Sequence, residues 1–201
     1  MKRARAVDFW ILWTDMVPCL VFWACAAEAQ GFHTQLMCTG ILLCRLCSLA
    51  YHTISMICPT MEPALFFLDL LGIASNSWAV PWILEASNSP LFKNKNVYAT
   101  GVFCTYCLIA CACVAGIFGS SFLLARRRLD FACKIQFLIL VLSIFGSIPA
   151  IMSGRLLLVT GPCILGMGFI FFFRSGRGDY SHVLWHASTF VGQMCFVLES
   201  F

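Results

Sequence analysis

The chain has 201 residues, of which 61% are apolar and only 11% are charged, with a net charge of +4. A soluble domain carries charge on roughly a quarter of its residues, so this chain lacks the polar surface of a water-exposed fold. The small and scattered charge excludes a nucleic-acid partner. Because one membrane span takes about 20 apolar residues, the sequence predicts a single all-α domain, a polytopic membrane protein built as a bundle of about seven transmembrane helices.

Seven apolar segments follow one another along the chain, and each is expected to be a helix. They cover residues 8–29, 31–58, 63–84, 97–125, 130–152, 156–173 and 180–198. Pro59 ends the second segment, and Pro63 suits the first turn of the third. The basic run Arg126–Arg128 is expected to end the fourth. The first segment resembles a signal peptide with an Ala-Glu-Ala cleavage site, but Asp15 and Pro18 interrupt it, which favours a retained helix.

The distribution of basic residues predicts the orientation of the chain, since lysine and arginine are enriched on the cytoplasmic side of membrane proteins. If the N-terminus is inside, the inner segments hold nine basic residues. The outer loops then hold only Lys93, Lys95 and Arg155. The sequence therefore predicts a cytosolic N-terminus and a C-terminus on the outside. It does not distinguish the plasma membrane from the Golgi or the endoplasmic reticulum.

Ionisable side chains at membrane depth are costly and usually mark function. The apolar segments contain Asp15, Arg45, His52, Asp69, His182 and His186. His182 and His186 are four residues apart and share one helix face, on which two imidazoles can hold one metal ion. Ser48 precedes His52 by the same spacing and therefore shares its face.

The predicted topology brings these side chains to one depth. The second segment runs inward, and the third and seventh segments start on the inner side. His52 then lies about 9 Å from the inner end of its helix, and Asp69 lies about 9 Å from the start of its own. The midpoint of His182 and His186 falls at a similar depth. Costly groups from three helices therefore share one level of the bilayer.

Three histidines with an exchangeable water form a catalytic type of zinc shell. Asp69 is placed to act as a general base or to orient a ligand, and Ser48 to hydrogen-bond the water, Asp69 or an oxyanion. One alternative stays open, in which these histidines form hydrogen bonds between helices and bind no metal. A histidine in a membrane helix more often bonds a neighbouring helix than a metal. Arg45 is expected to pair with Asp15 rather than with an anionic group in a cavity.

The ordered set Ser48-Leu-Ala-Tyr-His52, Leu68-Asp69-Leu-Leu-Gly72-Ile73 and His182-Val-Leu-Trp185-His186 resembles the progestin and adipoQ receptor family. That family includes the adiponectin receptors and the hemolysin III-like proteins, and it is similar, more distantly, to the alkaline ceramidases and related membrane hydrolases. The resemblance implies seven helices with a cytosolic N-terminus and a cavity open to lipid. It also implies zinc held by His52, His182 and His186, with Asp69 beside the metal through water and Ser48 nearby.

Three functions follow from these patterns. The first is a zinc-dependent, ceramidase-like hydrolase of a lipid amide or ester, whose partner is a ceramide-like or other acyl lipid. The second is a receptor in which zinc only joins helices, with a hormone or steroid ligand. The third, a transporter or membrane-organising protein, ranks last because we expect little polarity beyond Arg45 in the outer half of the bundle. Assembly as a homo-oligomer stays open.

Overall fold

The computed structural model describes residues 2–86, 95–119, 125–152, 154–174 and 180–201. These residues form seven α-helices and one short 3₁₀ helix, and they contain no strand. The all-α fold class is therefore confirmed for this part of the chain. The helices are α1 (Lys2–Glu28), α2 (Phe32–Ile57), η1 (Pro59–Met61), α3 (Glu62–Ala86), α4 (Lys95–Gly119), α5 (Ala125–Met152), α6 (Leu156–Arg174) and α7 (Tyr180–Ser200).

Each α-helix overlaps one of the expected segments, and the main difference concerns the basic run. α4 ends at Gly119, and Arg126–Arg128 lies in the first turn of α5. The expectation that these arginines end the fourth helix is therefore wrong. Residues 120–124, which the prediction included in the fourth helix, lie outside the described residues. The apolar residues 122–125 concealed the start of α5 at Ala125, because they prolong the apolar run up to the arginines.

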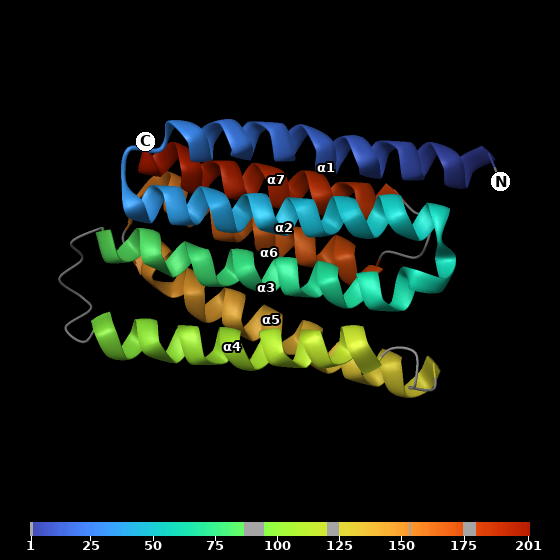
Figure 1. Cartoon of the computed structure of the whole chain (residues 1–201). Coiled ribbons are helices and arrows are strands. Elements are labelled where there is room, and N and C mark those ends of the chain that lie inside the picture. The colour runs from blue at the N-terminus through green and yellow to red at the C-terminus, as the bar shows by residue number, and fades with distance from the viewer. Residues whose placement is uncertain (1, 87–94, 120–124, 153, 175–179) are drawn as a thin grey trace.

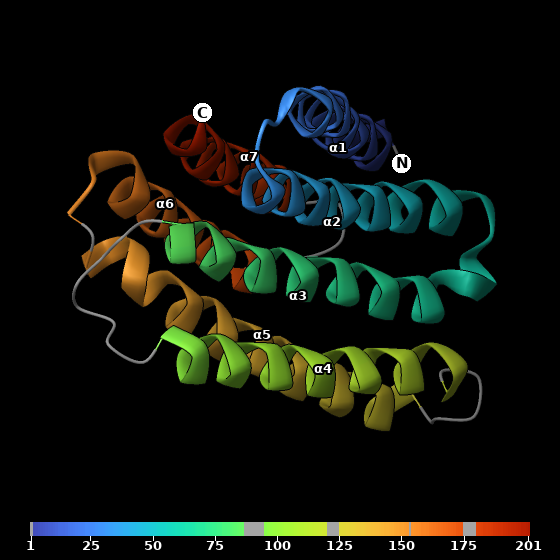
Figure 2. The same ribbon diagram turned by 60° about the vertical axis from the view of Figure 1, so that its left-hand side comes forward.

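The helices run alternately in opposite directions, so the two termini lie at opposite ends of the bundle (Figure 1). α2 packs along α3, α6 packs along α7, and α1 lies against both α2 and α7. α4 packs on α3 and α5 at the side of the bundle far from α1 (Figure 2). The arrangement leaves a cavity of about 240 Å³ whose lining residues come from α2, α3, α5, α6 and α7.

Parts of the surface are apolar enough to face lipid. Within the described residues, Phe9–Glu28 and Thr34–Ile57 are long and apolar enough to cross a membrane. Large apolar side chains also point outward from several helices, for example Trp23, Leu108 and Phe118, which are 64%, 71% and 77% exposed. Such surfaces are typical of proteins that contact a membrane or a partner. These observations favour membrane association, and the crossing of the membrane by all seven helices stays a prediction.

Gly72 allows α2 and α3 to approach each other closely. A Cβ atom at this position would lie 2.7 Å from Cβ of Cys47 and 3.1 Å from the backbone of Cys44. Real Cβ contacts are longer than this, so a larger residue would push the two helices apart. The close approach matters for the site, because Ser48 on α2 and Asp69 on α3 line the same cavity.

We expect Gly72→Ala to lower the midpoint of thermal unfolding, because overpacking two helices costs about 1–3 kcal/mol. The measurement is the unfolding curve of the purified protein in detergent. Gly119→Ala is the matched control, since a Cβ at Gly119 meets nothing within 4 Å. Equal midpoints for the two variants would contradict close packing at Gly72.

Candidate metal centre

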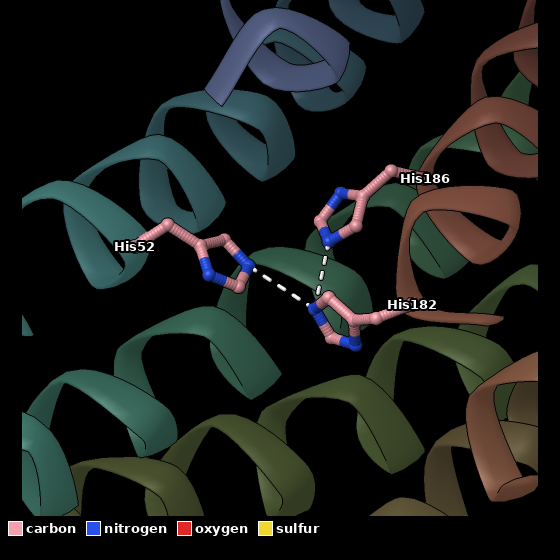
Figure 3. Close-up of side chains that lie close together, drawn as sticks. All are labelled: His52, His182 and His186. Atoms are coloured by element: carbon pink, nitrogen blue, oxygen red, sulfur yellow. Dashed lines mark hydrogen bonds between the residues drawn. The ribbon is translucent and has the colours of Figure 1, made fainter. Parts of the chain in front are cut away.

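Three histidines meet between α2 and α7, and Figure 3 shows their rings directed toward one another. Nε2 of His182 lies 3.3 Å from Nε2 of His52 and 3.0 Å from Nε2 of His186. One ligand atom from each ring lies within 4.8 Å of the other two. Nitrogen ligands about 2.1 Å from a tetrahedral zinc are about 3.4 Å apart, so these separations fit a shared metal ion.

The helices explain why the rings converge. His182 and His186 are one turn apart on α7 and so point to the same side of that helix. His52 reaches them from the last two turns of α2, where the ring of Tyr51 lies beside it at a centroid distance of 4.7 Å. His186 is buried, while His52 and His182 are partly buried. The predicted trio is therefore brought together, and it can hold a metal ion.

A carboxylate on α1 orients one of the three rings. Nδ1 of His186 lies 2.8 Å from Oδ1 of Asp15. With the proton on Nδ1, the ring donates a hydrogen bond to Asp15 and leaves the lone pair of Nε2 free toward His182. Metal-ligating histidines usually donate their second N–H in this way. The sequence analysis missed this contact, since no local pattern links residues 171 positions apart.

Arg45 balances the charge of Asp15. Its Nη1 atom lies 3.7 Å from Oδ1 of Asp15, and both side chains are almost fully buried. Its Nε and Nη2 atoms donate to Oε1 of Gln193 at 2.9 and 2.7 Å, and Nη2 also donates to Oγ1 of Thr189 at 2.8 Å. The expected pairing of Arg45 with Asp15 is confirmed. The guanidinium therefore also joins α2 to α7, through residues that follow His186 on α7.

Asp69 and Ser48 lie beside the histidines rather than among the ligand atoms. They line the cavity together with His186. Asp69 is 7% exposed, and its Oδ1 atom has no hydrogen-bond partner among the described residues. Ser48 on α2 and Asp69 on α3 reach this cavity from neighbouring helices. The structure thus brings the two side chains to the histidine end of the cavity, and their catalytic roles stay predictions.

The half of the bundle away from the histidines is more polar than expected. Asn76, Thr189 and Gln193 are buried there and line the cavity. The expectation of little polarity beyond Arg45 is therefore wrong. Neutral amides carry a small cost in a membrane helix compared with charged groups, so they did not stand out in the sequence. The signal available in the sequence was the number of residues between these polar side chains and the site residues on the same helix.

Comparison with known proteins finds no match for this chain. No family model fits the sequence, and no curated protein and no solved structure is significantly similar to it. The resemblance to the progestin and adipoQ receptor family therefore stays an interpretation of the three motifs. The geometry of the site carries the functional argument.

We expect Asp15→Asn to weaken metal binding about 10–100-fold, because the uncharged amide makes His186 a poorer ligand and leaves Arg45 without its counter-charge. The measurement is metal retention by the purified protein against increasing concentrations of a chelator. Asp130→Asn, which changes an exposed carboxylate on α5, is the control. Unchanged retention in a folded Asp15→Asn variant would contradict the orienting role of Asp15.

Proposed function

We propose that the chain is a polytopic membrane protein of the progestin and adipoQ receptor type that hydrolyses a lipid amide or ester, with ceramide-like lipids as the substrate class. The observation that carries this proposal is the convergence of three histidine Nε2 atoms, since one of these histidines, His186, lines the same cavity as Asp69 and Ser48. Zinc with three protein ligands keeps a fourth position for water or substrate, which is typical of catalytic rather than structural sites.

Different residues would hold the metal ion and orient its ligands. His52, His182 and His186 would hold the ion, and Asp15 would keep the His186 ring in the required tautomer. Bound zinc would supply a Lewis acid and a water that ionises near neutral pH.

Asp69, beside the histidines, acts as the general base that accepts a proton from water and returns it to the leaving amine or alkoxide. The Ser48 hydroxyl donates a hydrogen bond to Asp69 or to the developing oxyanion of the carbonyl.

The rest of the cavity suits an acyl chain. Its wall on α5 and α6 is mainly aliphatic and aromatic, including Leu140, Ile144, Leu165 and Phe169. An apolar wall stabilises a hydrocarbon chain by removing it from water, at about 25 cal/mol per Å² of buried area. It also keeps bulk water away from the reacting carbonyl, which strengthens the electrostatic interactions there.

We expect Asp69→Asn to retain zinc and to lower hydrolysis about 10²–10⁴-fold, because the amide keeps the shape of the carboxylate but cannot accept a proton. His186→Ala should lose both zinc and turnover. The measurements are elemental analysis of the purified protein and mass spectrometry of fatty acid released from ceramide, with Asp130→Asn as the control. A wild type without zinc, or turnover unaffected by His186→Ala, would sink the hydrolase proposal.

A receptor with a purely structural zinc is the second candidate. It is favoured by the way the polar contacts join helices, since the histidines and Arg45 connect α2 to α7 and Asp15 connects both to α1. In this case the histidine-to-alanine changes lower thermal stability, whereas Asp69→Asn leaves signalling intact and the wild type shows no turnover. The Asp69→Asn variant therefore separates the two candidates.

We further propose a cytosolic N-terminus and a C-terminus on the opposite side. The positions of the two termini at opposite ends of the bundle support placing them on opposite sides. The distribution of basic residues supports a cytosolic N-terminus. The chain has no Asn-x-Ser/Thr acceptor of its own. In microsomes we expect an acceptor tag added after Phe201 to be glycosylated and the same tag added before Met1 to stay unmodified. The reverse pattern would invert the topology.

A further inference from the structure

A second polar level lines the cavity two helical turns from the histidine level. On each of α2, α3 and α7, a residue at the histidine level has a polar residue seven positions away on the same helix. Seven residues are about two turns, so both members share a helix face and are separated by about 10 Å. α2 runs opposite to α3 and α7, so all three offsets point the same way (Figure 1). The pairs are His52 and Arg45, Asp69 and Asn76, and His186 and Gln193.

The three residues of the second level are buried and line the same cavity, with exposed fractions of 2% for Arg45, 8% for Asn76 and 1% for Gln193. Arg45 donates two hydrogen bonds to Oε1 of Gln193. Asn76 differs, because its Oδ1 atom has no hydrogen-bond partner among the described residues. A buried amide oxygen without a partner is costly and therefore points to a ligand or an ordered water.

The position of Asn76 restricts what that ligand group is. An amide oxygen accepts a hydrogen bond, so the ligand group must donate one. Gln193 and Arg45, at the same level, bear N–H groups that suit an acceptor. A hydroxyl is the small uncharged group that donates and accepts through one atom. The wall on α5 and α6 is mainly apolar, and the Ser143 hydroxyl on α5 donates to the Ile139 carbonyl of its own helix. The ligand hydroxyl is therefore held on the side formed by α2, α3 and α7.

We propose that the Asn76 end of the cavity is a subsite for a hydroxyl on the chain of the ligand, so that the preferred ligand is a hydroxylated acyl lipid. This rests on the proposed function, which puts the carbonyl of the lipid at the histidine level. The hydroxyl then lies about 10 Å farther along the acyl chain. A plain hydrocarbon chain leaves the Asn76 oxygen unpaired, and sites of that kind discriminate against ligands that lack the hydroxyl.

The test measures binding rather than turnover. The purified full-length protein in detergent is titrated with octadecanoic acid and with octadecanoic acids that carry one hydroxyl at successive chain positions. We expect one positional isomer to bind about tenfold more tightly than the unsubstituted acid. Asn76→Leu should abolish this preference while keeping the affinity for the unsubstituted acid. Asp130→Asn, which changes an exposed carboxylate on α5, should keep the preference.

Thermal unfolding separates recognition from a structural role. Replacing a buried amide whose oxygen lacks a partner by an apolar group of similar shape can be neutral or stabilising, so we expect Asn76→Leu to unfold at the wild-type temperature or above it. A lower midpoint in both Asn76→Leu and Asn76→Ala would show that Asn76 stabilises the fold and would overturn the proposal. Asn76→Ala, which only removes atoms, tests the same loss of preference if the leucine variant does not fold.

The outcomes distinguish the subsite from the hydrolase. Zinc content and ceramide turnover are measured on the same samples. A zinc-loaded, active wild type that binds no hydroxylated isomer better than octadecanoic acid overturns the subsite alone. Retention of the preference in Asn76→Leu also overturns it. A clear preference that Asn76→Leu abolishes, in a protein without zinc or turnover, supports the subsite and refutes the hydrolase.

Discussion

The side chain of Asp15 is fully buried, at 0% exposure. An unpaired charge is very costly at such a position, and much of the bundle is arranged around this carboxylate. Arg45 on α2 and His186 on α7 both contact the same oxygen, Oδ1. Arg45 is held in turn by Thr189 and Gln193 on α7. Removing one member of a buried pair leaves the other charge uncompensated, at a cost of about 3–5 kcal/mol. One carboxylate thus fixes α1, α2 and α7 relative to one another, and α2 and α7 carry the histidines.

The same charges favour a cation at the histidines. With the imidazoles neutral and both carboxylates ionised, Asp15 and Asp69 outweigh the single positive charge of Arg45. A net negative charge inside an apolar bundle is unfavourable, so a bound cation lowers the free energy of the folded state. The neutral Nε2 atoms supply ligands without adding charge. The net negative charge and the arrangement of the Nε2 atoms therefore both favour a cation at the three histidines.

The helices and the histidine, aspartate and serine positions could be predicted because their signals are local. Long apolar runs mark the helices, and a spacing of four residues places His182 beside His186. The pairing of Arg45 with Asp15 followed from the cost of burying either charge alone. The contact between Asp15 and His186 could not be predicted, since it depends on how α1 and α7 are rotated against each other. The start of α5 at Ala125 was hidden within an apolar run.

Three buried side-chain oxygens lack a hydrogen-bond partner among the described residues: Asp15 Oδ2, Asp69 Oδ1 and Asn76 Oδ1. The other oxygen of Asp15 already has two partners, whereas Asp69 and Asn76 both line the cavity. An apolar bundle tolerates a polar group only where something satisfies it. The free energy lost at these two oxygens on folding is regained when a bound molecule reaches them. If the cavity binds a lipid as proposed, the groups that make it costly to form are therefore the groups that select that lipid.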